Sequence, residues 1–435
     1  MKQVEFKKRR QQLMNMMGKQ SIAILPSATE RTRNKDVDYP FRQDSDFLYL
    51  TGFNEPEAVL VLIPKREHGE YILFCREKDA RQETWHGRRQ GQEGAVENYQ
   101  ADDSFPIDDL DDILPGLIEG KASVYHDMGR SAEFDQKLVK WINHIKMQSR
   151  KGAQVPHEFV SLDYLLHDMR LFKSPAEIKL MKQAAKISTA AHQKAMQVCQ
   201  PGLHEYAIEA EFAFEFRKNN AQAAYPAIVG GGENGCILHY TENQSKLQDG
   251  DLLLIDAGCE VQGYASDITR TFPVNGQYSA AQRQLYDIVL AAQKAAISEV
   301  KPGNHWNDPH LAAVRVITQG LLDYKILKGE FAQLLKGKAY QKFYMHRTGH
   351  WLGLDVHDVG DYKVGEQWRL LEPGMVLTVE PGIYIPAKSK GVHKKWWDIG
   401  IRIEDDVMVT KNGHEVLSAA LPTDADEIES LMASG

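Results

Sequence analysis

Five side chains in the C-terminal half of the chain could together bind metal ions. They are four carboxylates and one imidazole: Asp256, Asp267, His350, Glu380 and Glu404. Each carboxylate lies in or beside an apolar run of strand character, where an unpaired charge is costly. No neighbouring stretch supplies enough Arg or Lys to neutralise all four. We therefore expect a pair of divalent cations at this place.

The first two carboxylates are predicted to face each other across a β-hairpin. Turn-forming residues around 260–263 separate the apolar run 252–255 from residues 264–272. Folding the chain back about this turn places Asp256 opposite Asp267, and directly opposed side chains lie about 5 Å apart. Carboxylates this close repel each other unless a cation lies between them. Two surface aspartates on an edge hairpin are the alternative, which the apolar run disfavours.

Glu380 and Glu404 are predicted to repeat this arrangement with a longer connection. On an expected strand over 399–409, two isoleucines alternate with Arg402 and Glu404, so one face is apolar and the other polar. Arg402 shares the face of Glu404, which suits a residue that orients a ligating carboxylate. For this segment alone, a charged strand that faces solvent remains an equal alternative.

The histidines of the segment His346-Arg347-Thr348-Gly349-His350 need separate treatment. Two histidines four residues apart on a helix, with Glu after the first, would indicate a zinc protease. Here Arg347 holds the place of that Glu, and Thr348 and Gly349 disfavour a helix. A lone histidine is more often structural than ligating, so only the four carboxylates make His350 a candidate ligand.

The ligand types narrow the metal and the reaction. Carboxylate oxygens with one imidazole and no thiolate suit Mn(II), with Co(II) or Zn(II) able to substitute. Two such ions, about 3.5–4 Å apart and bridged by carboxylates and a hydroxide, generate a nucleophile at neutral pH and polarise a carbonyl. The pattern therefore predicts a dinuclear hydrolase.

Composition excludes several other classes of protein. The net charge of -8 argues against nucleic acid as a partner, and the basic cluster 7–10 is expected on the solvated face of a helix. No apolar run reaches the roughly 18 residues of a membrane span, and we read no signal peptide. The cysteines are widely spaced and are expected to be free thiols in a reducing compartment. We therefore expect a cytoplasmic protein.

The chain of 435 residues is long enough for two or three domains. Apolar runs at 57–64 and 71–75 indicate buried strands in an N-terminal α/β domain, with helices expected over 5–17 and 133–147. Ser174-Pro175-Ala176-Glu177 then forms a capping box with proline at the first helical position. The predicted domains are 1–172 and 173–435, and a second helix is expected over 204–219.

At this point the chain resembles the Xaa-Pro aminopeptidases, that is, the bacterial aminopeptidase P enzymes of the pita-bread metallopeptidases. The resemblance rests on the spacing of the five candidate ligands and extends to both predicted domains. The similar stretches are residues 39–47, 51–56, 231–243, 351–360, 378–382 and 400–405. It implies an α/β fold (α+β): an N-terminal creatinase-like α/β domain, and a pita-bread domain with a curved antiparallel sheet covered by helices.

The resemblance also implies a reaction and roles for the ligands. The reaction is release of the N-terminal residue from peptides whose second residue is proline. Asp256 would chelate one Mn(II), Asp267 and Glu404 would bridge both ions, and His350 and Glu380 would hold the other. Glu380 would also be the general base toward the bridging hydroxide, and later the general acid.

Further residues receive roles around the metals. His239 and His357 would line the pocket as catalytic residues, near the scissile carbonyl or the tetrahedral intermediate. Candidates for substrate or ligand contacts are His346, Arg402 and Tyr384. Trp85 resembles the tryptophan that caps the active site of a neighbouring subunit in related tetramers, although it could be an ordinary half-buried aromatic. We accordingly expect a homodimer or homotetramer.

Two other functions remain open on the sequence. A prolidase would use the same metal ligands to cleave Xaa-Pro dipeptides alone, and no loop that closes off the substrate is evident. A non-catalytic pita-bread protein that binds peptides or histones would have lost ligands, whereas all five are present. Methionine aminopeptidase is disfavoured because it does not need the N-terminal domain. Arg347 departs from the resemblance, since glycine is common at its position.

Overall fold

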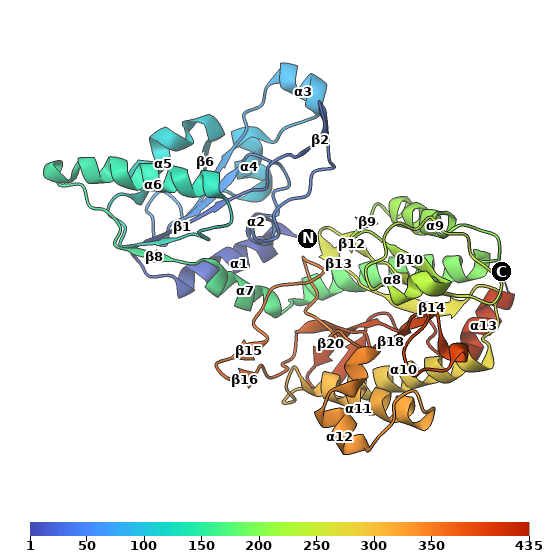
Figure 1. Cartoon of the computed structure of the whole chain (residues 1–435). Helices are drawn as coiled ribbons and strands as arrows, with labels where there is room; N and C mark the ends of the chain where they lie inside the picture. The colour runs from blue at the N-terminus through green and yellow to red at the C-terminus, as the bar shows by residue number, and fades with distance from the viewer. Residues whose placement is uncertain (435) are drawn as a thin grey trace. The chain divides into compact units, whose positions relative to one another are not determined.

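The computed structural model describes residues 1–434, and the chain divides into two compact units (Figure 1). The first is Met1–Met169, and the second begins at Arg170. The division falls within helix α7 (Asp163–Leu171), close to the predicted boundary at 172/173. The predicted capping box is confirmed, because Ser174 and Glu177 exchange hydrogen bonds across the start of α8 (Pro175–Val198).

The first unit is built on a six-stranded mixed sheet. Its strands lie in the order β6 (Asp103–Pro106), β5 (Tyr71–Cys75), β4 (Val59–Leu62), β1 (Ser21–Pro26), β7 (Ser123–Tyr125) and β8 (Glu158–Val160). Strands β1, β4 and β5 pair antiparallel, and the outer strands pair parallel. The two apolar runs predicted as buried strands form β4 and β5, so that prediction is confirmed.

The first unit also contains helices. They are α1 (Gln3–Met16), α2 (Ser45–Thr51), α3 (Ala80–His86), α4 (Gly91–Tyr99), α5 (Leu110–Ile118) and α6 (Ala132–Met147), and a short hairpin is formed by β2 (Thr32–Asn34) and β3 (Val37–Asp38). Helices α5 and α6 lie together on one side of the sheet in Figure 1 and share its main apolar core. Burial of the apolar stripe of α6 accounts for that placement.

The basic cluster at residues 7–10 is only partly solvated, contrary to the prediction. Arg9 and Arg10 are buried, and their guanidinium groups donate to the carbonyl oxygens of Tyr49 and Leu50. They also lie over the rings of Tyr49 and Tyr71. Arginine can be buried in this way because its planar head combines hydrogen bonds to carbonyls with stacking on aromatic faces.

The second unit contains antiparallel strands and six helices among the described residues. The helices are α8, α9 (Glu205–Lys218), α10 (Ala280–Ser298), α11 (Asp308–Asp323), α12 (Phe331–Lys336) and α13 (Ala425–Ala433). The predicted second helix of this part is therefore confirmed as α9. Figure 1 shows α8 and α9 beside β10, and α10 to α12 beside the later strands.

The second unit contains many short strands, which pair into several small sheets. They are β9 (Gln222–Ala223), β10 (Ile228–Gly231), β11 (Leu252–Asp256), β12 (Cys259–Val261), β13 (Tyr264–Ala265), β14 (Thr269–Pro273), β15 (Lys363–Val364), β16 (Gln367–Trp368), β17 (Val376–Val379), β18 (Gly382–Ile385), β19 (Ile399–Arg402), β20 (Asp405–Thr410) and β21 (Gly413–Val416). Every pair between them is antiparallel.

The predicted register of the first hairpin is wrong by two residues. Asp256 is paired with Thr269, not with Asp267. The turn lies at Gln262 and Gly263, both at positive φ, which is the conformation of a tight two-residue hairpin turn. The turn therefore lies one residue further along the chain than expected, and each cross-strand partner moves by two.

The predicted strand over 399–409 is interrupted. It consists of β19 and β20, and Ile403 and Glu404 lie between them. Residues 401–407 are all buried, so the expected polar face is not exposed to solvent. At the interruption the amide of Glu404 donates to the carbonyl of Thr269, which joins the two predicted carboxylate pairs.

None of the helices within residues 1–434 combines the length and the apolar character needed to cross a bilayer. All four cysteines are free thiols, and Cys75 and Cys259 are buried.

Candidate metal centre

Neighbouring strands bring the four candidate carboxylates into one row. Asp256 ends β11 and pairs with Thr269 of β14, and Thr269 bridges to Glu404. Val379 pairs with Asp405, and continuing this register past the end of β17 places Glu380 opposite Glu404. The predicted second pair of carboxylates is therefore formed by register, although the strands break at that point.

The donor atoms converge on a small volume. The Nε2 atom of His350 lies 3.3 Å from Oδ2 of Asp267 and 3.7 Å from Oε1 of Glu380. Donor atoms of Asp267, His350 and Glu404 all lie within 4.8 Å of one another. Glu404 is 1% exposed and Asp267 is 5% exposed, so these charges are largely withdrawn from water.

Tyr225 links Asp256 to Asp267, and the sequence reasoning did not identify it. Its hydroxyl lies 2.7 Å from Oδ1 of Asp256 and 2.5 Å from Oδ1 of Asp267. A hydroxyl has one proton, so it donates to one carboxylate and lies close to the other. A single tyrosine before a strand has no sequence signal that separates it from a core aromatic.

Arg402 contacts Asp256 directly, whereas the sequence predicted that it would orient Glu404. Its Nη2 donates to Oδ2 of Asp256 at 2.7 Å, and its Nε donates to Oγ1 of Thr269 at 3.2 Å. Thr269 in turn donates to Oε2 of Glu404 at 2.5 Å. Arg402 therefore orients Asp256 directly, and its hydrogen bonds reach Glu404 through Thr269.

The electrostatics of the cluster reflect crowded negative charge. Burial raises the pKa of Glu380 to about 7, and burial together with Asp267 raises the pKa of Glu404 well above its usual value. Burial lowers the pKa of His350, but the hydrogen bond to Asp267 and the negative charges of Asp267 and Glu380 together outweigh burial and bring the pKa to about 9. Without a metal, Arg402, the His350 imidazolium and protons on the buried carboxylates therefore balance the negative charge.

This donor set fits a pair of divalent cations. The row offers four carboxylates and one imidazole, with no thiolate, which is the ligand type of hard or borderline ions. Tyr225, Thr269 and Arg402 hold carboxylate oxygens of the row in place, as the outer partners of metal ligands do. A divalent cation would displace the protons that burial and repulsion retain.

His357 and His346 lie beside the candidate ligands. The rings of His350 and His357 are 4.3 Å apart between centroids. Nδ1 of His346 is 3.6 Å from Oε2 of Glu380, and its Nε2 is 2.9 Å from the hydroxyl of Tyr384. Burial, with Arg402 as a positive neighbour, lowers the pKa of His346 to about 3. His346 is therefore neutral at physiological pH.

Two predicted residues are less firmly tied to the cluster. The side chain of His239 is exposed, on the segment between β10 and β11. Trp85 belongs to the first unit, where it lies on α3 with 78% of its surface exposed. It is therefore exposed and not half-buried.

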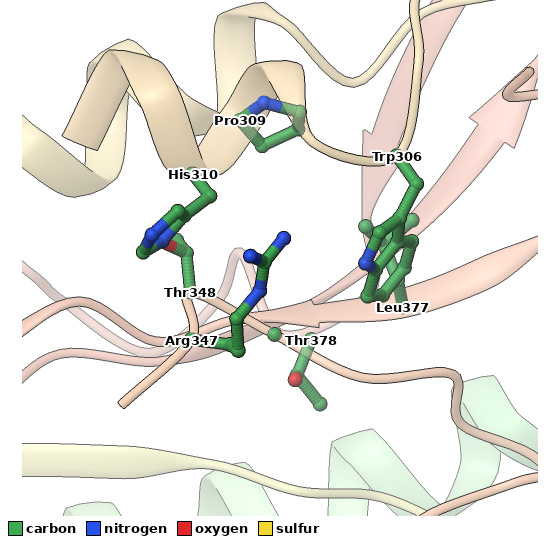
Figure 2. Close-up of a pocket in the computed structure, with 8 residues that line it drawn as sticks. Trp306, Pro309, His310, Arg347, Thr348, Leu377 and Thr378 are labelled. Atoms are coloured by element: carbon green, nitrogen blue, oxygen red, sulfur yellow. The ribbon is translucent and has the colours of Figure 1, made fainter. Parts of the chain in front are cut away.

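Arg347 anchors the loop between His346 and His350. Its Nη2 donates to Oδ1 of Asn307 at 2.6 Å, and its guanidinium lies over the ring of Trp368. Figure 2 shows the side chain pointing toward the start of α11, between His310 and Trp306, in a small pocket. Arg347 therefore ties the loop to the start of α11.

Comparison with known proteins identifies the domains. Residues 179–411 match metallopeptidase family M24, and residues 6–125 match the aminopeptidase P N-terminal domain. Together with the buried carboxylate row, this match defines a metal-dependent peptidase with an added N-terminal domain.

Several relatives are similar over nearly the whole chain. The Xaa-Pro aminopeptidase of Escherichia coli is 46% identical over 98% of this chain and 97% of its own length. Human Xaa-Pro aminopeptidase 3 is 35% identical over 99% of this chain and 86% of its own length. The structure of Pseudomonas aeruginosa aminopeptidase PepP superposes with a TM-score of 0.99 at 57% identity, and covers 100% of this chain and 98% of that one.

The chain belongs to metallopeptidase family M24. It is a metallo-aminopeptidase that uses divalent metal, and a Zn-substituted E. coli aminopeptidase P with bound product is among the similar structures (TM-score 0.97, 45% identity, covering 100% of this chain and 99% of that one). The predicted fold class, an N-terminal α/β domain followed by a pita-bread domain, is confirmed.

Proposed function

We propose that this enzyme releases the N-terminal residue from peptides with proline at the second position, using two Mn(II) ions. The observation that carries the proposal is the convergence of Asp267, His350 and Glu404, joined by Asp256 and Glu380 on the same row of strands. Relatives named Xaa-Pro aminopeptidase, similar over nearly the whole chain, support the choice of substrate.

The five ligands divide naturally between two ions. Asp256 would hold one ion, and His350 with Glu380 would hold the other. Asp267 and Glu404 would bridge, which fits the contact of Asp267 with Tyr225 on one side and His350 on the other. When bound, the ions would polarise the scissile carbonyl and make water acidic enough to attack at neutral pH.

Glu380 is assigned the proton transfers. Its carboxylate is mostly buried beside His346 and His350, and a carboxylate held at the reacting centre can accept a proton and return it. In the forward reaction Glu380 takes a proton from the attacking water and passes it to the prolyl nitrogen as the C–N bond breaks. His357, whose ring lies against His350, and His239 would line the substrate pocket.

The chemistry suits a bond that precedes proline. This bond is a tertiary amide without an N–H, and the ring fixes φ. Proteases that need a donor at that position bind such a substrate poorly. A site that holds the free amine beside carboxylates and stabilises the developing oxyanion electrostatically needs no donor there.

The decisive experiment compares three peptides of one first residue: Xaa-Pro-Yaa, Xaa-Ala-Yaa and the dipeptide Xaa-Pro. We expect release of Xaa from Xaa-Pro-Yaa, and little from the alanine peptide. Cleavage of the dipeptide alone would replace the proposal with a prolidase. The absence of turnover, with no metal retained on purification, would replace it with a binding module.

The metal is tested by removing and replacing it. Chelation should abolish turnover, and Mn(II) should restore it better than Co(II) or Zn(II). Restoration by Zn(II) alone would overturn the choice of Mn(II) and leave the peptide specificity intact. Metal analysis of the purified enzyme, with two equivalents expected per subunit, checks the stoichiometry independently.

We further propose a homodimer or homotetramer in which Trp85 reaches a neighbouring subunit's active site. The 78% exposure of this tryptophan supports a contact outside its own unit. Sedimentation of wild type and Trp85→Ala tests the proposal, and a monomeric wild type would contradict it. We also propose a cytoplasmic location, which the free thiols support. We place the domain boundary at 172/173, near the division between the two compact units.

A further inference from the structure

We propose that Glu205, on helix α9, is a positioning residue for His239 in the substrate pocket. The inference rests on the proposed function, since it takes His239 as a residue that contacts the substrate. It concerns the segment 231–245, which carries His239 and follows strand β10.

Glu205 is a fully buried carboxylate that is satisfied only by hydrogen-bond donors of this segment. Its exposed fraction is 0%, and no Lys or Arg pairs with it among the described residues. Oε1 accepts from the amide of Gly231 at 2.8 Å and from Nδ2 of Asn234 at 2.9 Å. Oε2 accepts from the hydroxyl of Tyr240 at 2.8 Å and from the amide of Ser245 at 2.8 Å.

These four donors span the segment from one end to the other. Gly231 and Ser245 are its ends, and Tyr240 directly follows His239. The amide of Glu205 also donates to the carbonyl of Ser245, so the far end is held twice. Hydrogen bonds to a charged acceptor are stronger than neutral ones, and their loss in a buried site is more costly. The side chain of Glu205 therefore attaches segment 231–245 to helix α9 along its whole length.

The hydrogen bonds from segment 231–245 to the Glu205 carboxylate are called the clamp below. Tyr240 connects this clamp to the catalytic cluster. Its ring packs in an apolar cluster with Ile228, Leu254 and Tyr384. Tyr384 accepts a hydrogen bond from Nη1 of Arg402 at 3.0 Å and contacts Nε2 of His346 at 2.9 Å. The residue next to His239 is thus fixed at its hydroxyl by Glu205 and at its ring by a residue of the site.

His239 depends on these neighbours for its position. Its own side chain is exposed, and no hydrogen bond to its imidazole is formed within residues 1–434. A second carboxylate of α9, Glu209, holds Nδ2 of Asn243 at 3.0 Å, which secures the segment further from His239. An exposed side chain with no partner keeps a fixed place only if its backbone is fixed, and small displacements of a substrate-contacting group are costly in rate.

Two substitutions test the clamp. Glu205→Gln keeps the shape but places an amide N–H₂ against donors, and Tyr240→Phe removes only the donor next to His239. We expect kcat/KM for Xaa-Pro-Yaa to fall about tenfold or more with Mn(II) occupancy unchanged. Tyr286→Phe is the matched control, because it removes a buried hydroxyl that donates to the carbonyl of Thr423 at 2.8 Å, outside the segment.

A double-mutant cycle with His239→Ala separates positioning from general damage. If Glu205 acts through His239, Tyr240→Phe should lower kcat/KM about tenfold in the wild type. In the His239→Ala background, the same substitution should lower kcat/KM less than about twofold. Equal losses in both backgrounds would overturn the inference, as would a loss in Tyr286→Phe of the same size as in Tyr240→Phe. Should Glu205→Gln fail to fold, the cycle stands on Tyr240→Phe alone.

The outcome is distinguishable from failure of the proposed function. Wild-type turnover of Xaa-Pro-Yaa and its dependence on metal decide the function before any variant is made. If the wild type has that activity and kcat/KM is unchanged in Tyr240→Phe and Glu205→Gln, the role of Glu205 is contradicted and the proposed function is not.

Discussion

At the residue scale, three of the five candidate ligands are held by a polar partner that the chain provides. Tyr225 lies on Asp256 and Asp267, Thr269 donates to Glu404, and Arg402 donates to Asp256. These contacts pre-set the carboxylate oxygens before any cation binds. Such outer partners raise metal affinity because less order must be created on binding.

The role of Glu380 leads to the first prediction. Glu380→Gln should keep the fold and lower kcat by about a hundredfold or more, because the amide cannot accept and return a proton. The assay uses Xaa-Pro-Yaa at saturating Mn(II), so that a weaker ligand is not mistaken for lost proton transfer. Glu366→Gln, at an exposed glutamate, is the control. Near wild-type turnover in Glu380→Gln would remove Glu380 from the mechanism.

Tyr225 provides the second prediction. Tyr225→Phe should weaken Mn(II) binding about tenfold, because it removes the hydroxyl that lies on two ligating carboxylates. Calorimetric titration of the metal-free protein with Mn(II) measures the affinity. Tyr264→Phe removes a buried hydroxyl that donates to Glu177 instead, and should bind like wild type. Equal affinities in all three proteins would show that Tyr225 is not a partner of the ligands.

At the element scale, close contacts between backbone segments form the site. Strand β11 ends at Asp256, and the chain then passes Ala257 and Gly258 before β12 begins at Cys259. A Cβ at Gly258 would collide with the carbonyl oxygen of Ser266, and one at Gly349 would collide with that of Thr378. Both glycines allow a backbone approach next to a candidate ligand, and their absence would move Asp267 or His350.

The third prediction concerns Gly258→Ala. Since the obstructing atom is backbone and cannot rotate away, the free energy of unfolding should fall by about 2–3 kcal/mol. Gly116→Ala is the control, because Gly116 is exposed in α5 and nothing lies near its added Cβ. That substitution should change stability by less than about 1 kcal/mol, in the stabilising direction. Urea denaturation followed by circular dichroism compares them, and equal stabilities would contradict the close approach.

At the scale of the whole molecule, the second unit is stabilised by buried polar groups as well as by its apolar core. His192 of α8 is fully buried, with Nε2 at 3.1 Å from the carbonyl of Ala257 and its ring edge-on to Phe212. Burial, together with the positive Arg270, lowers the pKa of His192 to about 3. The imidazole is therefore neutral in the folded protein, while the unfolded chain protonates it below about pH 6.5.

The fourth prediction follows from the sign of this shift. Between pH 6.5 and 3 the unfolded state binds a proton at His192 that the folded state does not, so stability falls as the pH falls. Between pH 7 and pH 5, the protonation difference at His192 should lower the free energy of unfolding by about 2 kcal/mol. In His192→Gln, which keeps a donor for Ala257, that contribution should vanish. Urea denaturation of both metal-free proteins at the two pH values measures it, and parallel losses would contradict it.

The candidate site could be predicted from the sequence because metal ligands must be particular residue types. Four carboxylates beside apolar runs and one histidine indicated a metal site, and the structure brings donor atoms of Asp267, His350 and Glu404 together, with Asp256 and Glu380 on neighbouring strands. Capping at Ser174, the strands β4 and β5 and the helix α9 were also predictable, because local propensity and burial act within a few residues. These features depend on short stretches of chain.

Only the tertiary structure decided which atoms meet. A shift of the turn to Gln262 and Gly263 paired Asp256 with Thr269, and the break between β19 and β20 directed Arg402 to Asp256. Tyr225 and the clamp at Glu205 bring together residues distant in sequence, for which no local pattern exists. Residue types determine the chemistry that is available, whereas register and packing between distant segments determine the geometry in which it operates.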